Sequence, residues 1–368
     1  MTATSDVSSL SAFRGPLLHF LSEPGLGTPD PASYSYFTDG LLVVADGRVQ
    51  AVGEAAELLP TLPAGTPVEH SPEGLIMPGM IDTHVHMPQL AVMASYGTQL
   101  LEWLETYTFP TESRFADADW SAKQSKVFLD LLLAHGTTSA LVFSTSHKVA
   151  SEALFSAAHA YNMAITTGRV MMDCNAPDGV RDTAEASYEE SRELIARWHG
   201  TGRQRYAVTP RFAATSTPEQ LSYAGKLMTE AEGLLMQTHW AENKAEIAWI
   251  AELFPERASY LDVYDHFGLL GPRSVLAHGI HIDDADRARL AETGTRIAFC
   301  PTSNTFLGSG LFDLASARGA DVEVGLASDV GGGTSLSMLV TMAEAYKVCQ
   351  LRGQSLNPFQ AFYMATLG

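Results

Sequence analysis

The feature that most constrains the fold of this chain is a regular alternation of short apolar segments with longer amphipathic segments from Gly74 onward. Eight apolar segments are typical of buried strands, and they cover residues 75–86, 138–145, 165–173, 205–212, 234–241, 274–280, 296–303 and 322–330. Helix-like segments lie between them, including 121–136, 149–162, 183–200 and 244–254. Eight strand–helix units predict an α/β fold, a (β/α)8 TIM barrel, with a doubly wound sheet as the alternative.

The residues before this alternation predict a separate small β-structure. Segments 13–21 and 40–53 are strand-like, and the second contains Asp46-Gly47, a strong signal for a hairpin turn. A loop rich in proline and glycine follows over residues 59–74. We therefore expect an N-terminal β-subdomain over residues 1–73 and a barrel over residues 74–368. No further segment offers an evident partner for the N-terminal strands.

Composition narrows the possible partners and compartment. The net charge of −19 disfavours nucleic acids and anionic membranes, which would be repelled at long range. No apolar run approaches the ~20 residues needed to span a bilayer, and the first ten residues lack the basic start and apolar stretch of a signal peptide. The three cysteines are widely spaced, which favours a reducing compartment. We expect a cytoplasmic protein that binds a small molecule.

Metal-ligand side chains recur at the ends of the predicted strands, where barrel enzymes carry their catalytic groups. His84 and His86 are two residues apart in a strand and so share one face. His239, His278 and Asp329 end three other strands. Either His239 or His278 alone would more often be a buried core histidine, but the convergence of all five favours a metal site. Imidazoles with a carboxylate suit Zn²⁺, or less often Fe²⁺, and such a metal lowers the pKa of bound water to about 7.

Three further polar residues are candidates at the same end of the barrel. Glu242 follows His239 by three residues and could move a proton between water and a leaving group, although an acid at a helix start is the alternative. Gln89 and Arg211 also follow predicted strands, with solvent exposure as the alternative for both. The Gly331–Gly333 run lacks the Lys-Ser/Thr of a phosphate-binding loop, so we expect a flexible turn there.

These motifs together resemble those of the guanine deaminases, a family of the metal-dependent amidohydrolase superfamily. The resemblance runs from about Gly40 to Gly368, and its motifs are PGMIDTHVHMPQ, LLEWLETYTFPTE, TPRF, HWAEN, AHG, FCPTSN and SDVGGG. It implies a TIM barrel beside a small β-sandwich, one zinc per chain, a homodimer, and hydrolysis of free guanine to xanthine and ammonia. It also implies sandwich strands after Gly368, which this sequence does not contain.

The resemblance assigns roles to the candidate residues. The implied zinc ligands are His84, His86, His239 and Asp329. Asp329 also accepts the proton of the attacking water, His278 contacts and orients the hydroxide, and Glu242 is the proton shuttle. The implied purine-binding residues are Gln89, Arg211 and Phe212. Arg211 supplies donors for the 6-oxo group, Gln89 supplies a donor and an acceptor, and Phe212 supplies a stacking face.

Two departures and several rival functions qualify these expectations. Ser328 stands before Asp329 where many relatives have threonine, and Trp240 follows His239 where a smaller residue is expected. The nearest rival is a related amidohydrolase that deaminates another ring, such as 8-oxoguanine, cytosine or a triazine. A non-catalytic barrel would have lost ligands or Glu242, and none is lost. Nucleic-acid editing conflicts with the acidic composition.

Overall fold

The computed structural model describes residues 10–97 and 99–368. The chain divides into two compact units, and the change from one to the other falls between Gly79 and Met80. Of the first ten residues, which we expect not to form a signal peptide, residues 1–9 lie outside the described residues. Among the described helices, none combines the length and the apolar character that a membrane crossing requires.

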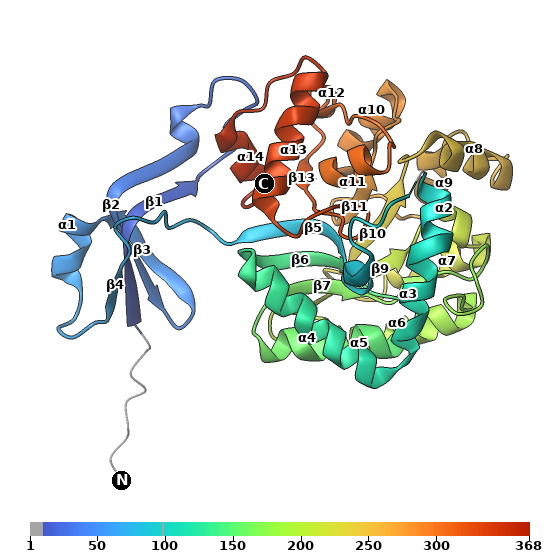
Figure 1. The fold of residues 1–368 in the computed structure, drawn as a ribbon, viewed down its shortest axis with the longest axis horizontal. Coiled ribbons are helices and arrows are strands. Elements are labelled where there is room, and N and C mark those ends of the chain that lie inside the picture. The colour runs from blue at the N-terminus through green and yellow to red at the C-terminus, as the bar shows by residue number, and fades with distance from the viewer. Residues whose placement is uncertain (1–9, 98) are drawn as a thin grey trace, which may run out of the picture. The chain divides into compact units, whose positions relative to one another are not determined.

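The first unit contains one four-stranded sheet with the strand order β3-β2-β1-β4 (Figure 1). Its strands are β1 (Leu10–Phe20), β2 (Tyr34–Ala45), β3 (Arg48–Glu54) and β4 (Val68–His70). The expected hairpin is present: Ala45 pairs with Arg48, and Asp46 and Gly47 have φ of 52° and 72°, as a tight hairpin turn requires.

The expectation that the N-terminal strands have no partner within the chain is wrong. β4 pairs in parallel with β1 inside the segment predicted as a loop. The short helix η2 (Leu59–Thr61) lies in the same segment, and α1 (Ala55–Leu58) directly precedes it. A strand of three residues is too short to show a periodic pattern, which is why the sequence did not reveal it.

The second unit is the predicted barrel of eight parallel strands. In order of pairing these are β5 (Met80–His86), β6 (Thr137–Phe143), β7 (Ala164–Gly168), β9 (Arg205–Pro210), β10 (Leu235–Trp240), β11 (Ser274–His278), β12 (Arg296–Phe299) and β13 (Val324–Leu326). A short strand, β8 (Val170–Met171), also pairs with β9. β13 returns to β5, where the Thr83 hydroxyl donates to the Leu326 carbonyl at 2.9 Å. The barrel is therefore nearly closed.

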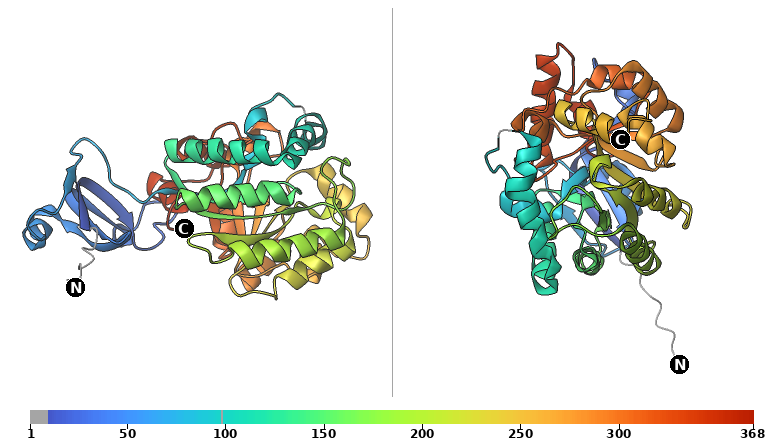
Figure 2. Two further views of the ribbon diagram at one scale, coloured as in Figure 1. Left: turned by 90° about the horizontal axis from the view of Figure 1, so that it is seen from below. Right: turned by 90° about the vertical axis from the view of Figure 1, so that its right-hand side faces the viewer.

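Helices cover the outside of the barrel (Figure 2). They are α4 (Ala118–Ala134), α5 (Lys148–Ala160), α6 (Ala184–Trp198), α7 (Pro218–Leu227), α8 (Lys244–Leu253), α9 (Tyr260–His266), α10 (Asp284–Thr293), α11 (Pro301–Phe306), α12 (Leu314–Gly319), α13 (Met338–Leu351) and α14 (Pro358–Met364). Side chains of Asp117, Thr183 and Asn243 cap the first turns of α4, α6 and α8. The four helical segments expected from the sequence correspond to α4, α5, α6 and α8.

A long segment without regular periodicity connects β5 to α4. It contains η3 (Met87–Val92), α2 (Leu100–Trp103), η4 (Leu104–Thr108), α3 (Phe109–Ser113) and η5 (Arg114–Ala116). Trp103, Phe109 and Glu112 of this segment are buried. Short helical pieces follow packing rather than sequence period, so the alternation of strands and helices gave no indication of them.

Candidate functional site

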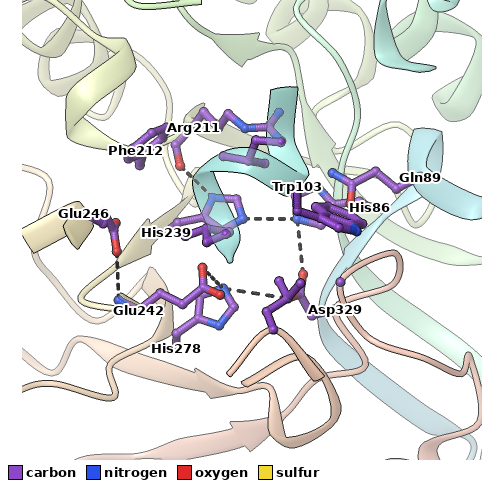
Figure 3. Close-up of a pocket in the computed structure, with 14 residues that line it drawn as sticks. His86, Gln89, Trp103, Arg211, Phe212, His239, Glu242, Glu246, His278 and Asp329 are labelled. Carbon is purple, nitrogen blue, oxygen red and sulfur yellow. Dashed lines mark hydrogen bonds and ion pairs between the residues drawn. The ribbon is translucent and has the colours of Figure 1, made fainter. Parts of the chain in front are cut away.

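A pocket lies where the barrel strands end (Figure 3). Its lining combines titratable, amide and apolar side chains: His86, Gln89, Leu100, Trp103, Leu104, Arg211, Phe212, His239, Glu242, Glu246, His278, Leu307, Asp329 and Gly332. Of the nine candidate residues from the sequence, eight line this pocket, and the ninth, His84, contacts His86 beside it. They come from strands far apart in the chain.

Imidazole nitrogens and one carboxylate converge at the floor of this pocket. The Nε2 atom of His86 lies 3.2 Å from that of His84 and 3.1 Å from that of His239. Asp329 Oδ1 lies 3.2 Å from His84 Nε2 and 3.3 Å from His86 Nε2. One ligand atom from each of His84, His239, His278 and Asp329 also falls within 4.8 Å of the others. Five ligand-type side chains thus surround one small volume.

Hydrogen bonds outside the cluster set which ring nitrogen faces it. His239 donates from Nδ1 to the Arg211 carbonyl at 2.7 Å, and His278 donates from Nδ1 to Asn304 Oδ1 at 2.9 Å. Each ring therefore directs Nε2, and not Nδ1, into the pocket, where this nitrogen is available to a metal or a ligand. The backbone is in the left-handed region at both positions: φ is 81° at His278, the last residue of β11, and 48° at Asp329, three residues after β13.

Asp82 connects β5 to the segment after β13, where the barrel closes. Its carboxylate accepts hydrogen bonds from the His84 backbone N–H at 3.2 Å and the Ser328 backbone N–H at 3.0 Å, and from the Ser328 hydroxyl. Burial raises the pKa of Asp82 to about 6, against these hydrogen bonds. The serine that stands where threonine is expected therefore ties the residue before Asp329 to β5.

The protonation states of the cluster suit a cation. Burial lowers the pKa of His84, lowers that of His86 to about 3, and lowers that of His239 well below its usual value. Burial opposes ionisation of Asp329, but hydrogen bonds from His84 and His86 hold its pKa well below the usual range. The Nε2 atom of His86 lies 3.1–3.2 Å from those of His84 and His239, a spacing at which the rings share a proton or hold a cation between them. The donor set therefore fits a divalent metal.

Glu242 lies beside this cluster, where a proton shuttle is expected. Its Oε1 accepts from the Ser309 hydroxyl at 3.0 Å, and its Oε2 lies 3.3 Å from His278 Nε2. Burial, reinforced by the charge of Asp329, raises its pKa to about 8. Glu246, at the third position of α8, accepts from the backbone N–H groups of Glu242 and Asn243 at 3.0 and 3.1 Å. Glu242 is therefore held in place by the cap of the helix that follows it.

The two polar residues expected to contact the substrate are buried and share one partner. Glu112 accepts from Gln89 Nε2 at 3.0 Å and from Arg211 NH1 at 2.8 Å. Gln89 Oε1 in turn accepts from the Gly331 backbone N–H at 3.1 Å. The solvent-exposed alternative for Gln89 and Arg211 is therefore wrong, since each is only 2% exposed.

The sequence reasoning assigned no role to Glu112. The motif LLEWLETYTFPTE ends at this residue and could have indicated it. Its polar residues have no assigned function in the sequence analysis.

The glycine run after β13 is a packed turn rather than a flexible one. A Cβ on Gly333 would lie 1.7 Å from the Ser328 carbonyl oxygen, and one on Gly331 would lie 2.7 Å from the Gln89 carbonyl oxygen. Gly332 lines the pocket. Glycine is thus required in this turn, because the backbone there lies too close to its neighbours for a Cβ atom. The Gly331 N–H also helps to orient Gln89.

Comparisons with known proteins agree with this geometry. The model of the amidohydrolase family matches residues 75–368. Guanine deaminase of Escherichia coli K12 is 49% identical over 333 residues, covering 90% of this chain and 76% of that protein. A probable guanine deaminase of Deinococcus radiodurans is 40% identical over 365 residues, covering 97% of this chain and 82% of that protein.

Solved structures give the same picture. The structure of E. coli guanine deaminase superposes with a TM-score of 0.93 at 46% identity, covering 97% of this chain and 83% of that one. Guanine deaminase of C. acetobutylicum, solved with guanine bound in its active site, superposes with a TM-score of 0.89 at 30% identity, covering 97% of this chain and 85% of that one. The chain therefore belongs to the amidohydrolase family and, within it, to the guanine deaminases.

Proposed function

We propose that the barrel unit is a zinc-dependent hydrolase that converts free guanine to xanthine and ammonia, with the N-terminal sheet as a separate subdomain. The observation that carries this proposal is the presence in one pocket of a metal-type ligand cluster, the buried carboxyl group of Glu242 and the polar side chains of Gln89 and Arg211. Family membership and the named relatives support the same activity.

The ligand set we propose is His84, His86, His239 and Asp329, with His278 next to it. A zinc ion held there would acidify water so that hydroxide is available near neutral pH. His278, whose ring is fixed by Asn304, directs Nε2 toward Asp329 Oδ2 at 3.8 Å and Glu242 Oε2 at 3.3 Å. It would hold the attacking oxygen between the two carboxyl groups.

Hydrolysis requires two proton transfers to the substrate, one to a ring nitrogen and one to the departing amine. Attack at C2 of guanine places charge on a ring nitrogen, which must be protonated, and the departing amine must leave as ammonia. Glu242, whose pKa is raised, can protonate the ring nitrogen, and Asp329, held ionised, can accept a proton of the attacking water. The two protons of the water can then return through Asp329 to Glu242, where one protonates the departing amine and the other restores the starting state. The Ser309 hydroxyl keeps the Glu242 carboxyl directed into the pocket.

Recognition of the ring falls to Gln89, Arg211 and Phe212. Arg211 has donors only, so it requires an acceptor such as the 6-oxo group, whereas adenine would present an amine there. Phe212 is 5% exposed and lines the pocket, where its ring can contact the purine face. A site built around a polar partner can reject a ring that lacks it by ~10⁴-fold or more.

The decisive experiment measures ammonia release from guanine, 8-oxoguanine, adenine, cytosine, a triazine and guanosine, with kcat/KM for each. Guanine should be the best substrate, and guanosine should be poorer because it adds a bulky sugar to the ring. A higher kcat/KM for another base would replace guanine as the substrate, and no turnover of any ring by zinc-loaded protein would overturn the hydrolase assignment.

A further inference from the structure

We propose that Glu112 is a positioning residue that makes the pocket select neutral 6-oxo purines: it orients Gln89 and Arg211 together and neutralises the Arg211 charge. This inference rests on the proposed function, since it explains how that ring would be read. Glu112 does not line the pocket and lies behind the two residues that do. It is therefore not a catalytic residue in the sense of touching substrate.

Both carboxylate oxygens of Glu112 are committed to the recognition residues. Oε1 accepts from Gln89 Nε2 at 3.0 Å, and Oε2 accepts from Arg211 NH1 at 2.8 Å. The Glu112 side chain has no exposed surface, and the side chain of Arg211 is 2% exposed. A buried carboxylate with two charge-assisted partners fixes the distance between them, because moving either one breaks a bond that water cannot replace.

The amide of Gln89 can take only one orientation in this arrangement. Its Oε1 accepts from the Gly331 N–H at 3.1 Å, while its Nε2 faces Glu112. A flipped amide would place N–H₂ against the Gly331 N–H and the amide oxygen against the carboxylate of Glu112. One hydrogen on Nε2 and one lone pair on Oε1 remain for a ligand. Glu112 therefore decides which side of the Gln89 amide donates and which accepts.

Glu112 also sets the charge that a ligand meets. The Arg211 guanidinium lies 5.3 Å from the centre of the Phe109 ring and is paired with Glu112 through a single nitrogen. The pair has no net charge, so the remaining guanidinium donors can bind a neutral carbonyl oxygen without stranding a buried cation. An anionic ring would have the Glu112 charge directly behind its partner, which disfavours binding.

The test compares Glu112→Gln and Glu112→Asp with the wild type in zinc-loaded full-length chains. Glu105→Gln is the matched control, because it removes an exposed carboxylate from the same segment. The probes are guanine as substrate, with hypoxanthine and purine-6-carboxylate as competitive inhibitors. Hypoxanthine is a neutral 6-oxo ring, and purine-6-carboxylate places a negative charge at the position that Arg211 would read.

We expect Glu112→Gln to raise the KM for guanine and the Ki for hypoxanthine by at least ~10-fold, with a smaller change in kcat, because it sets an amide N–H₂ against a neighbouring donor. The same variant should bind purine-6-carboxylate at least ~10-fold more tightly, because Arg211 loses its counter-charge. Glu112→Asp keeps the charge but is one methylene shorter, so it should weaken hypoxanthine without tightening the carboxylate. Glu105→Gln should change neither Ki.

A purely structural role for Glu112 would lower all affinities together. The proposal is overturned if the ratio of the two Ki values in Glu112→Gln equals that of the wild type. If Glu112→Gln does not fold, the aspartate variant decides the positioning role, and a wild-type Ki for hypoxanthine in it refutes that role. If the wild type does not deaminate guanine but the two Ki values still move in opposite directions, the proposed reaction fails while the role of Glu112 stands.

Discussion

Replacement of Glu242 by glutamine tests the proton shuttle with the least disturbance of the site. Glutamine has nearly the same shape, and its amide oxygen can still accept from the Ser309 hydroxyl, which Glu242 binds at 3.0 Å. The backbone N–H of residue 242 remains bound to Glu246. The substitution removes only the ability to carry a proton, together with a buried group whose pKa is raised to about 8.

The expected loss in kcat follows from that chemistry. A positioned acid–base group contributes ~10²–10⁴-fold, which corresponds to about 2.7–5.4 kcal/mol of activation free energy. Glu242 would act on both the ring nitrogen and the amine, so we expect the upper half of this range. The KM for guanine should change little, because recognition is assigned to Gln89, Arg211 and Phe212.

The assay is steady-state ammonia release, paired with elemental analysis of the same preparation. Metal content equal to that of the wild type separates loss of proton transfer from loss of the site. Turnover within ~10-fold of the wild type, at equal metal content, would refute the shuttle and return Glu242 to a helix-start acid.

Three further predictions concern the groups around this residue. Elemental analysis should find about one divalent metal per chain, and exhaustive chelation should abolish ammonia release, so full activity without metal would refute the mechanism. Arg211→Ala should lower the free energy of unfolding by about 3–5 kcal/mol in chemical denaturation, because it leaves the buried Glu112 without its counter-charge. The same variant should discriminate less between guanine and adenine, and an unchanged ratio of the two kcat/KM values would contradict that reading. Asn304→Ala should reduce kcat/KM by about 10–100-fold, because His278 loses the partner that fixes its ring at 2.9 Å, and wild-type kinetics would show that the ring is held otherwise.

Much of the candidate site could be predicted from the sequence, because residues at the carboxyl ends of barrel strands lie at the same face of the barrel. Eight apolar runs predicted the barrel, and residues at strand ends meet at one face. His84, His86, His239, His278 and Asp329 could therefore be grouped without coordinates. Glu242 followed from its three-residue spacing after His239. These inferences depend on local periodicity and topology, which the sequence carries directly.

Other features depended on contacts between distant segments, which no local pattern encodes. Glu112 lies 99 residues before Arg211 and meets it only because the irregular segment after β5 folds against β9. Asp82 and Ser328 are 246 positions apart and bond across the closure of the barrel. The pairing of β4 with β1 likewise joins segments without periodicity. The sequence by itself determined the barrel and grouped the candidate site residues at one end of it. The tertiary structure alone decided which buried charges lie behind them, because a buried charge is stable only beside the partners that folding provides.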